Sequence, residues 1–314
     1  MSAPQFLRGR YWGVALRGMA MGAADVVPGV SGGTIAFITG IYQELLDSLS
    51  RLGPHCITVL RREGIAATWR YINGSFLLAL FSGILLSVFS LARVIGLLLQ
   101  TYPILVWSFF FGLILASAVP IVRHIPRWSP GVVLCLALGI VTAIAVSELR
   151  PAQVPATPLT LFLSGALAIC AMVLPGISGA FILLMIGIYP RLLDAVHDLQ
   201  FVNLGCFAAG AAAGLMLFSR LLSWLMHHYI ARTLAFLAGI LLGSLKIVWP
   251  WKLATGTVSG SDKLAPLLSN CLPSAYENAT GQPAQFGWAL CAAVAAAVLV
   301  LVLESLGRRH KVHD

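Results

Sequence analysis

The chain contains six predominantly apolar runs, each about as long as a helix that crosses a ~30 Å hydrocarbon layer. They cover residues 75–99, 103–122, 131–147, 202–226, 230–249 and 286–303. Only 10% of the 314 residues are charged, against about 25% in an ordinary soluble domain, which is too few to cover a water-exposed surface of this size. The sequence therefore predicts an all-α, polytopic integral membrane protein that forms a single membrane domain over residues 1–314.

The net charge of +9 comes from basic residues that gather between the apolar runs. In a soluble protein such a charge favours nucleic acid as a partner, but in a membrane protein it is typical of loops on the cytoplasmic side. We therefore expect membrane lipids, and no nucleic acid, around the protein. The seven histidines and six cysteines show no C-x-x-C pair or other metal-ligand spacing, so no metal or cofactor is expected.

Two further apolar segments, 13–49 and 158–196, are interrupted by proline and closely spaced glycines at residues 28–33 and 175–179. Proline lacks the amide donor and glycine favours non-helical backbone, so a helix should end at each break. Each flanking piece of 15–17 residues is about 24 Å long at ~1.5 Å per residue, which is too short to cross the membrane alone.

The two broken segments are copies of each other. At an offset of 147 residues, 11 of the 22 positions in residues 28–49 are identical to their counterparts. A second match, at an offset of 127 residues, aligns several glycines and pairs Arg93 with Arg220. Ordinary helix packing explains the small residues alone, but the duplication as a whole predicts two repeats, at about 12–148 and 158–304.

Basic residues flank the first broken segment on both sides. Arg8 and Arg10 precede it and four arginines in residues 51–70 follow it, and the positive-inside rule places both groups in the cytoplasm. We therefore expect segment 13–49 to form a re-entrant helical hairpin. Each repeat then has one hairpin and about three crossings, so the second repeat is inverted. Both termini become cytoplasmic and the 250–285 loop becomes external.

The Pro-Gly-x-Ser-Gly turn at both breaks suits an anion. Irregular backbone at membrane depth is tolerated only where it is buried in protein or lines a wet cavity, and opposed broken helices in inverted repeats are typical of alternating-access transporters. A helix that begins at such a turn offers backbone N–H groups, the positive end of its dipole and a hydroxyl. The alternative is that the glycines only permit a tight turn. The predicted substrate-binding residues of the breaks are Ser31, Gly32, Gly33, Thr34, Ser178 and Gly179.

Three arginines in or beside apolar segments are further candidates for the substrate path. Arginine holds phosphate through a planar fork of donors, so Arg17, Arg93 and Arg220 are predicted to contact it. For Arg220 the alternative is a side chain that extends to the cytoplasmic interface.

Two acids in the first hairpin, Asp25 and Glu44, are candidates for coupling transport to protons, because intramembrane acids are functional by default. The alternative for Glu44 is a place at the water-exposed end of the hairpin. Their counterparts in the second repeat are Met172 and Arg191, so acid-based coupling would belong to the first repeat alone.

Residues 23–36 (AADVVPGVSGGTIA), followed by Gly-Ile-Tyr at 40–42, resemble the first signature of the bacterial polyprenyl-phosphate transporter family. Residues 168–179 (AICAMVLPGISG) resemble the second signature, and the resemblance covers about residues 12–250. It implies translocation of undecaprenyl phosphate, the lipid carrier of cell-wall synthesis, back across the bacterial cytoplasmic membrane for reuse.

Two other functions are open at the level of sequence. A transporter of a soluble anion would need the same features. A membrane phosphatase acting on polyprenyl diphosphate would need paired glutamates and an arginine beside the motif serine. This chain has 11 acidic residues but no Glu-x-x-x-Glu pair, and it has glycine at the position of such an arginine. We therefore expect a transporter without catalytic residues, whose oligomeric state the sequence does not indicate.

Overall fold

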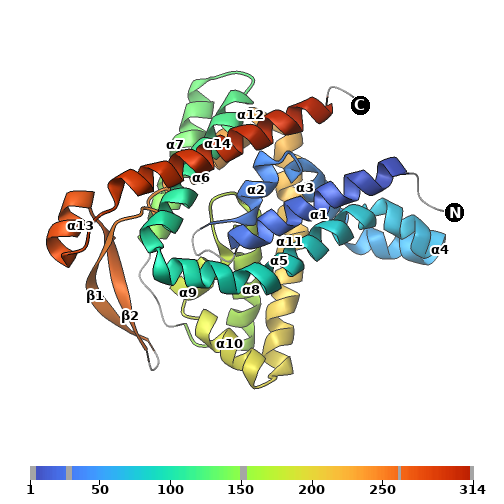
Figure 1. Cartoon of the computed structure of the whole chain (residues 1–314). Helices are drawn as coiled ribbons and strands as arrows, with labels where there is room; N and C mark the ends of the chain where they lie inside the picture. The colour runs from blue at the N-terminus through green and yellow to red at the C-terminus, as the bar shows by residue number, and fades with distance from the viewer. Residues whose placement is uncertain (1–4, 26–29, 149–153, 261–262, 312–314) are drawn as a thin grey trace.

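The computed structural model describes residues 5–25, 30–148, 154–260 and 263–311, and it is built almost entirely of helices (Figure 1). The first half contains α1 (Gln5–Asp25), α2 (Gly32–Ile38), α3 (Tyr42–Ser50), α4 (Pro54–Tyr71), α5 (Gly74–Thr101), α6 (Pro103–Arg123) and α7 (Pro130–Ser147). The second half contains α8 (Pro158–Val173), α9 (Gly179–Met185), α10 (Tyr189–His197), α11 (Phe201–His228), α12 (Ile230–Ser244), β1 (Lys252–Gly260), β2 (Lys263–Asn270), α13 (Pro273–Thr280) and α14 (Phe286–Lys311).

The six predicted spans fall on α5, α6, α7, α11, α12 and α14. Within the described residues, α5, α6, α7 and α11 are long and apolar enough to cross a membrane, and α9 and α10 pass the same test together although they are bent by 102°. The prediction of an all-α polytopic membrane protein is confirmed. α12 is shorter than predicted, because the backbone after Ser244 makes a tighter turn in which Ile247 N donates to Ser244 O at 2.9 Å.

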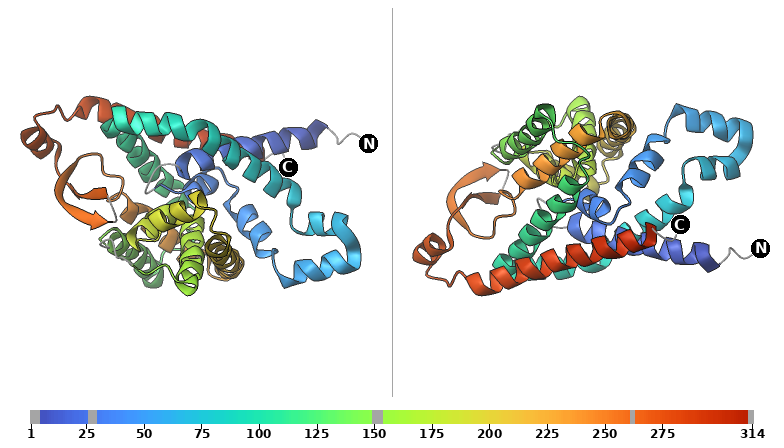
Figure 2. Two further views of the ribbon diagram at one scale, coloured as in Figure 1. Left: turned by 90° about the horizontal axis from the view of Figure 1, so that it is seen from below. Right: turned by 90° about the horizontal axis from the view of Figure 1, so that it is seen from above.

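Apart from α4 in the first half and β1, β2 and α13 in the second, the two halves follow the same order of elements, and their long helices pair in the same way. α1 packs along α5, as α8 packs along α11. α7 packs on α12 and α14 packs on α6, so each half contributes its last helix to the other (Figure 2). α4 and the start of α1 lie on the opposite side of the molecule from β1, β2 and α13 (Figures 1 and 2).

Glycines at matching positions allow the paired helices to approach closely. A side-chain carbon at Gly83 of α5 would collide with the carbonyl oxygen of Ala15 on α1. One at Gly210 of α11 would collide with that of Phe162 on α8. Small residues bring helix backbones together where lipid gives no hydrophobic driving force between helices.

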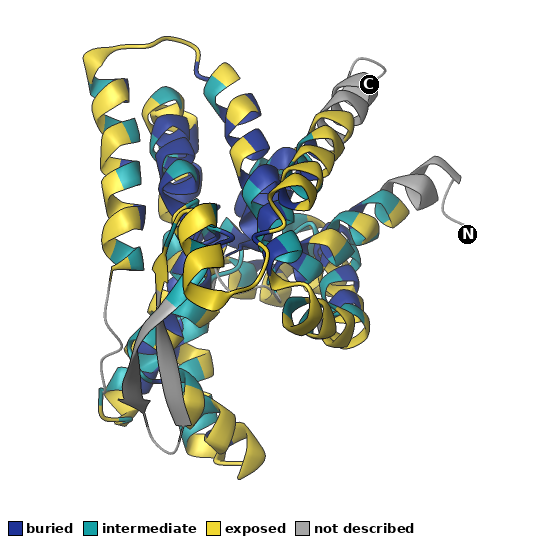
Figure 3. Ribbon diagram, turned by 60° about the vertical axis from the view of Figure 1, so that its left-hand side comes forward, coloured by how far each residue is buried: buried dark blue, intermediate teal, exposed yellow. Residues whose placement is uncertain are grey.

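Buried residues gather at the centre and along α12, and exposed apolar residues cover the outer faces (Figure 3). Phe89 on α5, for example, is 84% exposed. Such a side chain is favourable in lipid and costly in water, as expected for a helix that faces the bilayer.

The structure adds elements where the sequence suggested only loops. α4 lies in the 50–74 segment, and the 250–285 segment contains the antiparallel hairpin β1–β2 followed by α13. The hairpin region is fixed to the helices by two indoles: Trp249 Nε1 donates to Cys271 O at 2.8 Å, and Trp251 Nε1 donates to Ala284 O at 2.9 Å.

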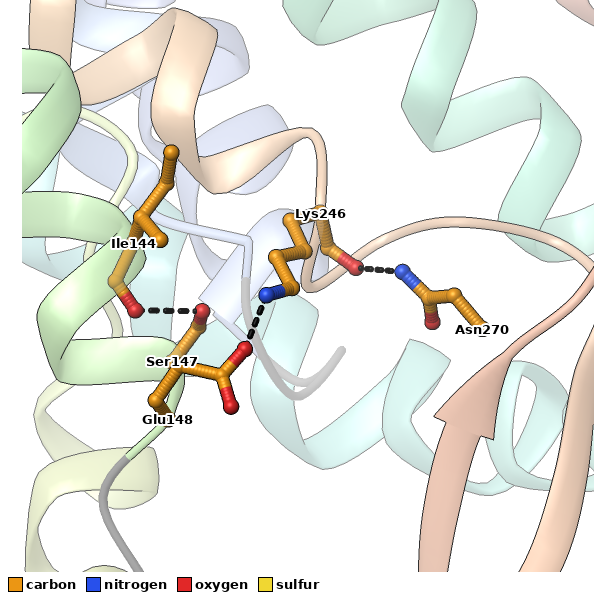
Figure 4. A network of polar contacts seen from close by, with 5 residues as sticks. All are labelled: Ile144, Ser147, Glu148, Lys246 and Asn270. Atoms are coloured by element: carbon orange, nitrogen blue, oxygen red, sulfur yellow. Dashed lines mark hydrogen bonds and ion pairs between the residues drawn. The ribbon is translucent and has the colours of Figure 1, made fainter.

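A polar network joins the end of α7 to the segment that follows α12 (Figure 4). The carboxylate of Glu148 pairs with the ammonium of Lys246, and Asn270 Nδ2 donates to the Lys246 carbonyl at 2.8 Å. The network therefore connects residues of both halves beside β2.

Candidate functional site

The first break lies between α1 and α2, and polar groups accept from the amides at the start of α2 that have no partner within the helix. Ser31 is the N-cap residue, with an extended backbone, and its Oγ accepts from Gly33 N at 3.1 Å. Asp25, the last residue of α1, accepts from Gly32 N at 2.6 Å through Oδ1. Pro28 and Gly29 of the predicted turn lie outside the described residues.

The second break lies between α8 and α9. Gly176 has φ +88°, a left-handed conformation that favours glycine. Ser178 is the N-cap residue of α9, and its Oγ accepts from Phe181 N at 3.4 Å. Gly179 packs closely on α8, because a side-chain carbon there would collide with Ala168 O.

The two breaks contact each other directly. Ser31 Oγ lies within donating distance of two carbonyl oxygens of the second break, Met172 O at 3.2 Å and Leu174 O at 3.1 Å. Gly176 N donates to Thr34 Oγ1 at 3.1 Å. Ser31 and Thr34 are fully buried, so these bonds satisfy the irregular backbone inside protein rather than in lipid.

Two features of this junction were not foreseen from the sequence. Tyr42, at the start of α3, donates its hydroxyl to Val173 O at 3.1 Å. The repeated Gly-Ile-Tyr sequence was a signal for it, because its tyrosine follows both breaks. The other feature is the carboxylate of Asp25, which accepts from the Gly32 amide. The sequence had predicted that this amide would be free to bind an anion.

Arg220 and Arg93 take no part in these hydrogen bonds. Arg220 is exposed on α11, and its Nε donates to Ser50 O at 3.1 Å, at the end of α3. Arg93 is exposed on α5, and it has no hydrogen bond or ion pair within the described part of the chain. Arg17 is half-buried on α1, about two turns before Asp25.

The acids of α3 are used in contacts between helices. Glu44 Oε1 accepts from Asn73 Nδ2 at 2.9 Å, which links α3 to the start of α5. Asp47 Oδ1 accepts from Ser223 Oγ at 2.6 Å, which links α3 to α11. Of the two acids predicted to couple transport to protons, only Asp25 lies at the junction of the breaks.

The structure therefore brings together Ser31, Gly32, Gly33, Thr34 and Asp25 from the first break with the backbone of the second break. A polytopic helical protein whose two irregular, polar backbone segments meet inside the bundle is of the membrane transporter class. A family model described as VCA0040-like, undecaprenyl phosphate translocase-like, matches residues 21–263, and the chain belongs to this family.

Two relatives cover most of the chain. A protein of Vibrio cholerae named polyprenyl-phosphate transporter is 47% identical over 301 residues, which are 95% of this chain and 98% of that protein. A protein of Staphylococcus aureus with the same name is 32% identical over 258 residues, which are 76% of this chain and 86% of that protein. No solved structure matches the chain.

Proposed function

We propose that this protein transports a polyprenyl phosphate, namely undecaprenyl phosphate, across the bacterial cytoplasmic membrane. Transport would return this lipid carrier for reuse in cell-wall synthesis. The names of the two relatives and of the family support the substrate. The junction of the two breaks carries the proposal, because it places polar backbone and hydroxyl groups within an otherwise apolar bundle.

The phosphate head group would bind at this junction while the isoprenoid tail stays in lipid. Ser31, Thr34 and the amides at the starts of α2 and α9 are its proposed ligands, together with Ser178. In the present conformation Ser31 and Thr34 bond to the opposite break. A phosphate that enters between the breaks would replace these bonds with stronger, charge-assisted ones.

Asp25 would couple this exchange to protons. Its carboxylate accepts a hydrogen bond from the Gly32 amide, in the place that a bound anion would take. Protonation removes the negative charge and weakens the bond, so the amide becomes available to phosphate. Head-group binding should therefore be favoured as the pH falls, and the first repeat alone would carry this coupling.

The proposed arrangement in the membrane has two inverted repeats, a re-entrant hairpin in each, and cytoplasmic termini. The common order and common pairing of the helices in the two halves support it. So does the position of α4 and the start of α1, opposite β1, β2 and α13.

The test is translocation of fluorescent undecaprenyl phosphate between the leaflets of liposomes, followed by its accessibility to an impermeant quencher. We expect Gly32→Val to abolish transport, because the new side chain meets the Asp25 carboxylate at the junction. Asp25→Asn should remove the pH dependence of the rate. Glu63→Gln, which neutralises an exposed acid on α4, is the matched control and should leave both properties unchanged.

Each rival function has its own outcome. Uptake of a soluble phosphate or sulfate, without movement of the lipid, would show that the substrate is a soluble anion and not a lipid phosphate. Release of inorganic phosphate from undecaprenyl diphosphate, above the rate of a Ser31→Ala, Ser178→Ala double variant, would make the protein an enzyme. Lipid transport by Gly32→Val at the wild-type rate would show that the breaks are structural turns that do not bind the phosphate.

A further inference from the structure

The C-terminal half of α11 is closed against α3. Arg220 Nε donates to Ser50 O at 3.1 Å, and Ser223 Oγ donates to Asp47 Oδ1 at 2.6 Å. Gly53 lies so close to the guanidinium of Arg220 that a side-chain carbon there would collide with it. We call this contact the α3–α11 gate.

The repeat predicts a second gate between α10 and α5, because α10 corresponds to α3 and α5 corresponds to α11. The corresponding residues are Arg93 on α5, and Asp194 and His197 on α10. In the described structure α5 and α10 make no comparable contact. All three side chains are exposed, so the α5–α10 gate is open while the α3–α11 gate is closed.

The space beside each gate also differs between the two halves, and the more open space lies beside the open gate. Beside α3, Asn73 Nδ2 donates to Glu44 Oε1 at 2.9 Å and links α3 to the start of α5. At the corresponding place beside α10, a cavity of about 210 Å³ lies between α10 and the start of α11, lined by Arg191, Gln200 and Asn203. Gln200 occupies the position that corresponds to Asn73.

We infer that Arg220 and Arg93 are positioning residues that act in turn: Arg220 holds the α3–α11 gate closed in this conformation, and Arg93 donates to the carbonyl of His197 to close the α5–α10 gate in the opposite one. The inference rests on the proposed transport function, since a transporter must expose its site alternately to the two sides. It gives both arginines a role that does not require contact with the phosphate.

The two gates can be measured separately by spin labels at corresponding exposed positions. One pair, at Arg51 and Leu221, spans the α3–α11 gate, and the other, at Asp198 and Val94, spans the α5–α10 gate. The labels are attached to cysteines in a background whose six native cysteines are replaced by serine. Distance distributions are recorded in lipid nanodiscs without substrate, so they report the gates even if the transported molecule proves to be another anion.

The wild-type protein should show a short distance across the α3–α11 gate and a long one across the α5–α10 gate. Arg220→Ala should raise the population with the opposite pattern by about tenfold, since it removes one charged hydrogen bond from one state only. Adding Arg93→Ala should reverse this shift, because the second change weakens the other state. Arg123→Ala, the loss of an exposed arginine at the end of α6, should shift neither distance.

Ser223→Ala provides a second way to weaken the α3–α11 gate if Arg220→Ala does not insert into the membrane, and it should shift the populations in the same direction. Unchanged distances in both Arg220→Ala and Ser223→Ala would overturn the inference. So would an Arg93→Ala change that adds to the shift instead of reversing it. A shift of the gates without lipid transport would contradict the proposed substrate while leaving the gates in place.

Discussion

Ser31 is the residue at which the two breaks are joined, and its neighbours explain why a small hydroxyl residue lies there. It is completely buried, it accepts from the amide of Gly33, and it lies within donating distance of Met172 O and Leu174 O. Ser178 has the corresponding position in the second half, but its Oγ accepts a single, longer bond of 3.4 Å from Phe181 N. The two serines are therefore equivalent in sequence and unequal in structure.

Ser31→Ala should accordingly destabilise the protein more than Ser178→Ala. The first change leaves buried polar groups of both breaks without a partner, which costs about 1–3 kcal/mol, whereas the second weakens only one cap. The measurement is the unfolding midpoint of each purified variant in the same detergent. Equal midpoints would mean that the serine–carbonyl bonds across the breaks contribute nothing to stability.

Lys252 is a second residue whose surroundings lead to a test. Burial lowers the pKa of its ammonium from 10.5 to about 8, although the charged form also lies 4.4 Å from the face of the Trp107 ring. The cation–π contact favours the charge by about 0.5–2 kcal/mol, which is less than the cost of removing an ammonium from water.

Stability should therefore rise with pH between about 8 and 10.5. In this range the folded protein has lost the Lys252 proton and the unfolded chain still holds it, so the free energy of unfolding increases, by an amount on the order of 1–3 kcal/mol. Lys252→Arg keeps its charge throughout and should lack this increase. If the free energy of unfolding changes with pH in the same way in the wild-type protein and in Lys252→Arg, Lys252 does not titrate with a lowered pKa in the folded protein.

The motif residues of the breaks could be predicted from the sequence, but their contacts could not. Pro-Gly-x-Ser-Gly is a local pattern, so Ser31 and Ser178 could be recognised as N-terminal residues of short helices. The bonds from Ser31 to the second break join positions more than 140 residues apart, and only the folded chain brings them together. For the same reason Asp25 could be recognised as an acid in an apolar segment, but not as the partner of Gly32.

At the scale of helices, pairing depends on glycines that face a neighbouring backbone. Gly210 on α11 lies against the carbonyl of Phe162 on α8, whereas Gly205 on the same helix has open space where a side chain would be added. α5 repeats this difference, with Gly83 against α1 and Gly96 facing open space. The four glycines therefore form matched pairs for mutation.

Gly210→Val and Gly83→Val should separate their helix pairs and strongly reduce the yield of folded protein. A valine cannot be accommodated against a backbone carbonyl without moving the whole helix, and such overpacking costs about 1–3 kcal/mol or more. Gly205→Val and Gly96→Val should give wild-type yields. The measurement is the monodisperse fraction in size-exclusion chromatography, and equal losses at all four positions would show that valine is simply unfavourable in these helices.

The same scale shows which elements a sequence can predict. Long apolar runs predicted α5, α6, α7 and α11, which in the described part of the chain are long and apolar enough to cross a membrane, because the bilayer imposes a length on a spanning helix. The end of α12 was placed too late, since residues 245–249 are apolar apart from Lys246 although the backbone has left the helix. α4 and the β1–β2 hairpin were missed because their segments are polar or mixed, and no repeat partner supported them.

At the scale of the whole molecule, the two halves resemble each other in order and pairing, but they are not in the same state. α3 is closed on α11 and α10 is not closed on α5. In the proposed arrangement the halves are inverted with respect to the membrane, so the two gates face opposite sides. This arrangement depends on how the first hairpin inserts.

The insertion can be tested by labelling single cysteines with an impermeant thiol reagent in intact cells. Arg62 on α4 and Asn278 on α13 are both exposed, and α4 and α13 lie on opposite sides of the molecule (Figures 1 and 2). In a background that lacks the native cysteines, Asn278→Cys should be labelled from outside, and Arg62→Cys should be labelled only after the membrane is permeabilised. If segment 13–49 crossed the membrane instead of returning, α4 would lie outside and Arg62→Cys would be labelled in intact cells. The repeats would then be parallel, and both the proposed topology and the alternation of the two gates between opposite sides would be wrong.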